Sequence, residues 1–183
     1  MKKLFYAVLL LIGVGFMFAS CSKEGTDMGT LEGKWWVAEK AEFYFNGSAV
    51  STEPKFVFIY NNAINKIKFE KGTATIVLDN GYTLTASYST SGKSLVLDYI
   101  SYTVRSSSKN SIVFEQLPYE ESVAIVGKED VSTGDVFNGK EIFYAATGAP
   151  YYYVSDSGKA IPCCPSSNEE YWYDTQVSYF SAE

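Results

Sequence analysis

Cys163 and Cys164 are adjacent, and their thiols are the side chains best suited to redox or soft-metal chemistry. A disulfide between neighbours would be strained, because consecutive Cα atoms lie about 3.8 Å apart, below the usual disulfide range. Strained disulfides are reduced easily, and some act as switches. Two thiolates are too few for a soft-metal site, and no histidine can complete one. Because Pro162 and Pro165 indicate a loop, we expect two thiols or an intermolecular bridge, with a vicinal disulfide as the alternative.

Runs of consecutive aromatic residues are the second feature that could bind a partner. The two runs in the last third of the chain are Tyr151, Tyr152, Tyr153 and Tyr171, Trp172, Tyr173. Successive side chains of a strand point to opposite faces, so at least one ring of each run must face outward or line a groove. Exposed Tyr and Trp rings offer a large rigid surface with a polar tip, which suits a glycan or a protein. The alternative is that these rings pack beneath loops or cover a barrel end.

The absence of histidine excludes several classes of enzyme. Ser-His-Asp and Cys-His nucleophiles, histidine general bases and histidine metal sites all require that residue. Carboxylate pairs such as Glu169-Glu170 could hydrolyse glycosides, but a solvated acidic surface is the better explanation for them. We therefore expect no enzymatic activity, no cofactor and no metal site.

The chain is acidic, with 15 basic and 21 acidic side chains and a formal net charge of −6. If Lys2 and Lys3 leave with a cleaved signal, 13 basic side chains remain against 21 acidic ones, a balance of −8. An acidic surface repels a phosphate backbone, so we expect no nucleic-acid partner.

The first residues have the architecture of a secretory signal: two lysines, an apolar run from Leu4 to Phe18, and small residues up to Ser20. The apolar run is shorter than the ~20 residues of a transmembrane helix. The stretch Phe18-Ala19-Ser20-Cys21 resembles the lipobox of bacterial lipoproteins. This resemblance implies that residues 1–20 are a signal peptide and that acylated Cys21 anchors the protein in the bacterial cell envelope. The expected location is the outer membrane, on its periplasmic or its surface face. Residues 21–30 predict a flexible tether.

From Leu31 onward the pattern predicts antiparallel strands. Tyr82, Leu84, Ala86 and Tyr88 alternate with polar residues, which places the four apolar side chains on one face. The preceding Asp79-Asn80-Gly81 favours a hairpin turn. Residues 31–117 repeat such patterns and form the predicted main domain. Residues 118–183 are less regular, and they either complete the same structure or form an extension packed on it.

Residues 31–116 resemble the lipocalin-like domains of Bacteroidetes-type lipoproteins. The matching stretches are Gly33-Lys34-Trp35, Ile67–Gly72, Tyr88–Leu97, Tyr102-Thr103-Val104 and Val113-Phe114. The resemblance implies a small antiparallel barrel with an interior cavity. It also implies that Trp35 packs at the closed end beneath Arg105, the only arginine. The predicted fold is thus an all-β, lipocalin-like barrel with a β-rich C-terminal extension, and a β-sandwich is the alternative.

Three functions compete on this basis. The leading hypothesis is a non-enzymatic, lipid-anchored protein that binds a small apolar molecule or a lipid inside the barrel. The second is a surface module that binds glycan or protein through the two C-terminal aromatic runs. An enzyme ranks third, because it would need two carboxylates that converge in a cleft. The first hypothesis requires an interior that is not packed solid, and the second requires exposed rings.

Overall fold

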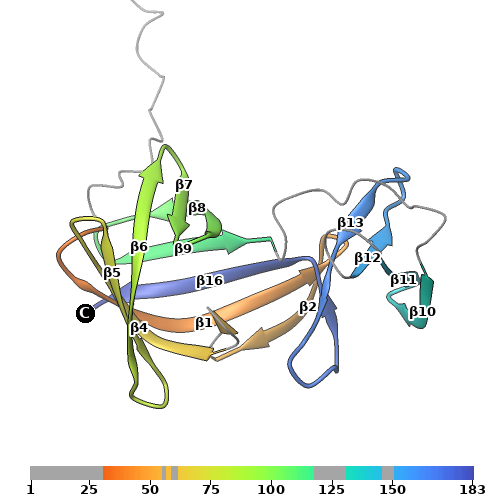
Figure 1. Cartoon of the computed structure of the whole chain (residues 1–183), viewed down its shortest axis with the longest axis horizontal. Coiled ribbons are helices and arrows are strands. Elements are labelled where there is room, and N and C mark those ends of the chain that lie inside the picture. The colour runs from red at the N-terminus through yellow and green to blue at the C-terminus, as the bar shows by residue number, and fades with distance from the viewer. Residues whose placement is uncertain (1–30, 55–56, 59–61, 118–130, 146–150) are drawn as a thin grey trace, which may run out of the picture.

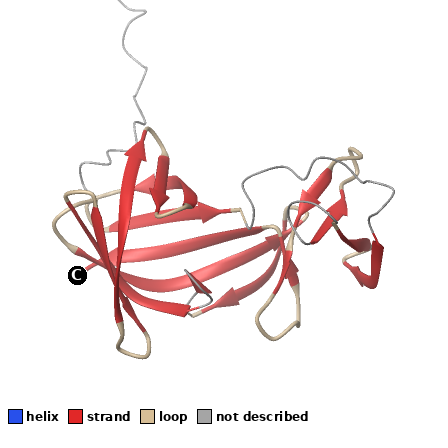
Figure 2. Ribbon diagram, viewed as in Figure 1, coloured by secondary structure: helices blue, strands red, loops and turns tan. Residues whose placement is uncertain are grey.

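The computed structural model describes residues 31–54, 57–58, 62–117, 131–145 and 151–183; the expected signal peptide, Cys21 and the tether lie outside these ranges. Within them the chain forms strands and turns and no helix (Figure 2). The strands are β1 (Trp35–Phe45), β2 (Ser48–Glu53), β3 (Val57–Phe58), β4 (Asn62–Glu70), β5 (Thr73–Leu78), β6 (Thr83–Ser91), β7 (Ser94–Leu97), β8 (Ile100–Ser107), β9 (Ser111–Gln116), β10 (Val131–Phe137), β11 (Lys140–Tyr144), β12 (Tyr151–Val154), β13 (Ala160–Pro162), β14 (Cys164–Pro165), β15 (Trp172–Tyr173) and β16 (Thr175–Ala182).

Eight antiparallel strands form a closed barrel (Figure 1). Their order is β1-β16-β9-β8-β7-β6-β5-β4, and β4 pairs again with the first residues of β1. The second half of β1 pairs with β2, and β3 pairs with β4 outside the ring. Closure leaves the barrel strands without the free edges that favour aggregation. The predicted all-β barrel is therefore confirmed, and the sandwich alternative is not observed.

The last strand of the chain completes the barrel. β16 lies between β1 and β9, with Trp36 opposite Ala182 and Ser111 opposite Ser181. Strands from the two ends of the chain thus become neighbours. The sequence left open whether residues 118–183 belong to the barrel, and the structure shows that residues 175–182 do.

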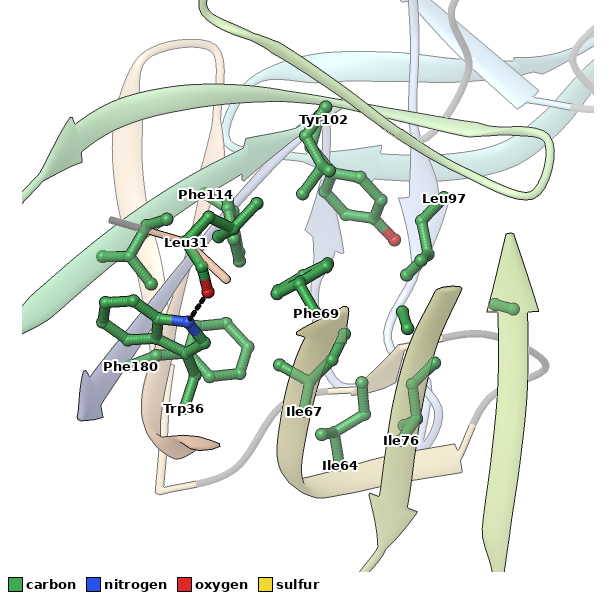
Figure 3. Packing of buried hydrophobic residues seen from close by; sticks show 14 of the residues in the cluster. Leu31, Trp36, Ile64, Ile67, Phe69, Ile76, Leu97, Tyr102, Phe114 and Phe180 are labelled. Atoms are coloured by element: carbon green, nitrogen blue, oxygen red, sulfur yellow. Dashed lines mark hydrogen bonds between the residues drawn. The ribbon is translucent and has the colours of Figure 1, made fainter. Parts of the chain in front are cut away.

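The apolar side chains that alternate along the strands fill the barrel. In β5, for example, Ala74, Ile76 and Leu78 are buried, whereas Thr73 is exposed. The largest fully buried side chain is that of Trp36, whose Nε1 donates a 2.8 Å hydrogen bond to the carbonyl of Leu31 (Figure 3). The core around it includes Leu31, Ile64, Ile67, Phe69, Ile76, Leu95, Leu97, Val104, Ile112, Phe114 and Phe180.

The two ends of the barrel differ. We call basal the end that contains Leu31 and the turns 71–72, 92–93 and 108–110, and distal the end that contains the turns 46–47, 79–82 and 98–99. At the basal end, the Gly33 amide donates to the carbonyl of Phe69 at 3.1 Å, and buried Leu31 plugs the interior. At the distal end, Tyr171 and Tyr173 pack against the core.

A small sheet stands beside the barrel. Strands β10, β11, β12 and β13 pair in that order, and β14 pairs with β15. Figure 1 shows this sheet on the side of the barrel away from the C-terminus. Phe45, from the distal end of β1, packs in one cluster with Ile142, Tyr153 and Cys163. The sheet and the barrel therefore share an apolar contact.

The described residues contain no helical segment with the length and hydropathy of a transmembrane span.

Candidate binding surface

The first aromatic run is divided between the two faces of the small sheet. Tyr152 is fully buried, and its ring stacks on Phe143 with the centroids 5.4 Å apart. Tyr153 is 2% exposed and packs on Phe45 at 4.4 Å. Only Tyr151 keeps part of its ring accessible. Tyr152 and Tyr153 are therefore structural residues, and a binding role is retained for Tyr151 alone.

The second run covers the distal end of the barrel. The ring centroids of Tyr171 and Tyr173 lie 5.5 and 4.9 Å from that of Phe43. The hydroxyl of Tyr171 donates to Glu53 at 3.3 Å, and burial raises the pKa of Tyr171 to about 12. These two rings close the apolar interior, as the packing alternative expected, whereas Trp172 points away from it toward Tyr151.

Three partly accessible rings line up across strands β11, β12 and β15, and we call them the aromatic strip: Tyr144, Tyr151 and Trp172. Tyr144 contacts Tyr151 edge to face at 5.8 Å, and Tyr151 contacts Trp172 in the same way at 5.1 Å. Tyr144 is 51% exposed. Val131, opposite Tyr144 in the ladder, is also exposed and extends the apolar surface.

Tyr144 was not among the residues predicted from the sequence. It is a single aromatic residue at the end of β11, and only its pairing with Tyr151 across the ladder joins it to the strip. Polar groups flank the other end of the strip, because the turn before Trp172 exposes Asn168, Glu169 and Glu170. The Ser166 hydroxyl holds this turn by accepting bonds of 3.0 and 3.1 Å from the amides of Glu170 and Tyr171.

The barrel interior, where the leading hypothesis places a ligand, contains rings that pack on one another. The centroid of Phe114 lies 5.4 Å from Phe180, 6.1 Å from Tyr102 and 6.4 Å from Phe69. The Tyr102 hydroxyl points toward Leu97 inside the barrel (Figure 3). A ligand in this part of the barrel would have to displace packed rings.

The expected pairing of Trp35 with Arg105 does not form. Trp35 is half-buried, and the Nζ of Lys66 lies over its ring, 4.8 Å from the centroid. Arg105 is exposed on β8 and forms an ion pair with Glu115. The tryptophan inside the barrel is the next residue, Trp36, because alternation along β1 turns neighbouring side chains to opposite faces. The basal cation over Trp36 is Lys34, at 4.5 Å from the ring centroid.

Cys163 and Cys164 are two thiols in this structure, with no disulfide between them. Cys163 is buried against Phe45, Ile142 and Tyr153, and this burial raises the pKa of its thiol. Cys164 is half-buried in β14, opposite Tyr173. A thiol that stays protonated in an apolar cluster is a poor nucleophile, so Cys163 is better explained as a core residue.

The described residues contain no group of three or more Cys, Asp or Glu side chains arranged to hold a metal ion. One polar cluster surrounds Glu42 on the outside of β1. Lys40, Tyr44 and Tyr179 donate to its carboxylate at 2.6, 2.8 and 2.8 Å. These bonds lower the pKa of Glu42 to about 2, with Lys40 the largest contributor. The carboxylate is thus ionised and occupied by its neighbours, which suits a structural role.

Asp174 joins the barrel to the small sheet. Its Oδ2 accepts 2.7 Å hydrogen bonds from the Asn46 amide and from the Tyr153 hydroxyl, and its Oδ1 accepts one of 2.8 Å from Thr175. The Asp174 amide donates to the Tyr44 carbonyl at 2.8 Å. Burial and this contact raise the pKa of Tyr153. The buried carboxylate therefore connects β12, the β1–β2 turn and the start of β16.

Replacing Asp174 by alanine is expected to lower the free energy of unfolding by about 2–4 kcal/mol, because buried donors left without an acceptor cost about 1–3 kcal/mol each. Urea denaturation followed by tryptophan fluorescence measures the change. Asp156→Ala is the matched control, since the Asp156 side chain is 87% exposed and pairs only at the surface with Lys140. Combining Asp174→Ala with Tyr153→Phe should cost less than the sum of the two single changes. Equal losses for Asp174→Ala and Asp156→Ala would contradict the role of this junction.

Comparisons of the chain with protein-family models, with curated proteins and with solved structures find no match.

Proposed function

We propose that this protein is a non-enzymatic, lipid-anchored binding protein of a bacterial cell envelope, and that its aromatic strip binds a neutral glycan. The observation that carries the proposal is the chain of ring contacts from Tyr144 to Tyr151 and from Tyr151 to Trp172, which joins two neighbouring strands of the small sheet to β15. The rings are held edge to face by their own contacts, so their surface is ordered before a ligand binds.

The chemistry around the strip favours a sugar over other ligands. Aromatic faces pack against the apolar C–H faces of sugar rings, and Tyr hydroxyls provide hydrogen bonds at the border of the contact. The exposed carboxylates of Glu169 and Glu170 can accept hydrogen bonds from sugar hydroxyls beside Trp172. The acidic balance of the chain disfavours a phosphorylated or sulfated ligand.

The anchoring and the family are part of the same proposal. The lipobox-like stretch that ends at Cys21 supports lipid attachment and an outer-membrane location, on either face. The closed eight-stranded barrel supports membership of the lipocalin-like domains of Bacteroidetes-type lipoproteins. The absence of histidine from the sequence supports a binding role over a catalytic one.

A small apolar molecule or lipid inside the barrel is the second candidate. Polar groups buried in the distal half favour it: Gln176 and Ser178 are both buried, with Nε2 and Oγ 3.1 Å apart, and Tyr102 adds a hydroxyl. Such groups could orient a ligand that has one polar end. The packed rings described above weigh against it. Native mass spectrometry of protein purified from its own envelope would detect such a ligand as an adduct that is lost on denaturation.

Trp172→Ala and Tyr144→Ala are expected to weaken glycan binding at least tenfold each, because an aromatic anchor commonly contributes about 2 kcal/mol. The measurement is affinity electrophoresis in gels that contain neutral polysaccharides such as β-glucan, mannan, galactan or xylan. Tyr99→Ala is the matched control, because Tyr99 is 66% exposed in a distal turn outside the strip. The proposal would be contradicted if Trp172→Ala were retarded as strongly as the unaltered protein. It would also be contradicted if no neutral polysaccharide retarded the unaltered protein.

A further inference from the structure

Lysine recurs at the basal end of the barrel. Each of its three hairpin turns contains one exposed lysine: Lys71 between β4 and β5, Lys93 between β6 and β7, and Lys109 between β8 and β9. The distal turns contain acids and aromatic rings instead, with Asp79 and Tyr82 in one turn. Because alternate turns of an antiparallel barrel lie at the same end, this sequence pattern separates charge along the barrel axis.

The charge at the basal end has the opposite sign to the whole chain. Seven of the ten described Lys and Arg residues lie there, and they are Lys34, Lys66, Lys68, Lys71, Lys93, Arg105 and Lys109. Four carboxylates accompany them, those of Glu32, Glu70, Glu115 and Glu183, so the basal side chains sum to seven minus four, or +3. The chain as a whole carries −6.

Ion pairs inside this end neutralise only part of the charge. Lys66 pairs with Glu183 and Lys68 pairs with Glu70, each at 2.9 Å. Within the described ranges, no carboxylate forms an ion pair with the three turn lysines. The Lys34 ammonium donates to the backbone carbonyl of Lys109. This hydrogen bond holds the positive charge of Lys34 beside the turn that contains Lys109. The three turns and Lys34 thus form a cationic surface.

The described chain begins at this same end. Leu31 fills the basal interior, and it is the tenth residue after Cys21 in the sequence. Ten extended residues reach at most about 33–36 Å. If Cys21 carries lipid, as the proposed function requires, the basal end is held within that distance of the membrane.

We propose that the basal end docks on a membrane surface of anionic phospholipid headgroups, with Lys71, Lys93 and Lys109 as the contact points. The inference rests on the proposed lipid anchor and adds an orientation to it. Lysines attract anionic headgroups when they lie close to the surface, and the attraction falls off within a Debye length of about 8–10 Å. The distal acids therefore oppose docking only weakly. In this orientation the small sheet and its aromatic strip lie away from the bilayer, on the side of the barrel opposite the C-terminus (Figure 1).

The test is a footprint of lysine amines on the full lipoprotein. The protein is extracted from expressing cells, and its intact mass shows whether lipid is attached. It is then placed on vesicles of phosphatidylcholine alone or of phosphatidylcholine mixed with phosphatidylglycerol, and acylated with acetic anhydride. We expect Lys71, Lys93 and Lys109 to react several-fold more slowly on the mixed vesicles, with recovery in high salt. Lys140, at the start of β11, and Lys159, in the turn between β12 and β13, should react equally on both.

Matched charge reversals complete the test. K93E/K109E should abolish the protection of Lys71, whereas K140E/K159E, with the same change in net charge, should preserve it. Equal reactivity of the basal lysines on both kinds of vesicle would overturn the docking surface and leave the anchor intact. If the intact mass shows no lipid, the anchor fails, and flotation of the protein with the mixed vesicles decides the docking surface alone. Salt-sensitive flotation lost only in K93E/K109E would support it, and no flotation would overturn it.

Discussion

A chain that stops at residue 117 is expected not to fold, although it contains every residue that resembles a lipocalin-like domain. It lacks β16, so β1 and β9 lose the partner that lies between them. It also lacks Phe180, which packs on Phe114 inside the barrel. Two open strand edges and an uncovered core should remove the whole cooperative stability, which is about 5–15 kcal/mol for an ordinary domain.

Circular dichroism in the aromatic region and urea denaturation compare residues 21–117 with residues 21–183, both with Cys21→Ser. A synthetic peptide of residues 172–183, which supplies β16 in trans, is expected to restore part of the aromatic signal. A scrambled peptide of the same composition is the control. Cooperative unfolding of residues 21–117 by themselves would show that β16 is dispensable.

Trp36→Ala is expected to lower the free energy of unfolding by about 3–5 kcal/mol, the usual cost of removing a fully buried large aromatic side chain. The change opens a cavity between the β1 wall and the basal plug. It also removes the hydrogen bond from Nε1 to the Leu31 carbonyl, which holds Leu31 in the basal end of the barrel. The measurement is the midpoint of urea denaturation.

Trp35→Ala is the natural control, because the two tryptophans are neighbours of identical size. Trp35 is half-buried on the outside of β1, and its cation–π contact with Lys66 contributes about 0.5–1 kcal/mol at such a site. We therefore expect a loss of about 1 kcal/mol for Trp35→Ala. A larger loss for Trp35→Ala than for Trp36→Ala would reverse the assignment of the inner and outer faces of β1.

The two proposals assign different roles to the two sides of the molecule: membrane docking to the basal lysines and glycan binding to the aromatic strip. The basal end, where the proposed tether would join the barrel, has the cations, and the small sheet at the other side has the accessible rings. Each proposal can fail without the other. The lysine footprint tests membrane docking in the absence of glycan, and the polysaccharide gels test glycan binding in the absence of lipid.

The sequence by itself predicted most of the strands and which side chains share a face within a strand, but not which face of β1 turns inward. A period of two is local, because each side chain in a strand points opposite to its neighbour whatever lies beyond. Turn residues are local too: Gly81 has a positive φ of 85° in the turn between β5 and β6, which glycine adopts without strain. For these reasons an all-β barrel was predicted from composition, alternation and resemblance, and residues 31–117 supply seven of its eight strands.

The sequence determined less about the candidate site. It placed Tyr151 and Trp172 among the candidates, but it could not separate them from Tyr152, Tyr153, Tyr171 and Tyr173, which share the same composition and spacing. It also chose Trp35 where the structure buries Trp36, because the parity of a strand relative to the core depends on the register with its neighbours. Tyr144 was missed because no local pattern distinguishes it.

Only the tertiary structure decided which strand closes the barrel and which rings meet. β16 inserts beside β1 although more than a hundred residues separate them, and the strip joins rings from β11, β12 and β15. Such pairings depend on which apolar surfaces remain uncovered after the local hairpins form, and no short window of sequence contains that information. Alternation along a strand is a property of the local backbone, whereas closure, register and the composition of a surface are properties of the whole fold.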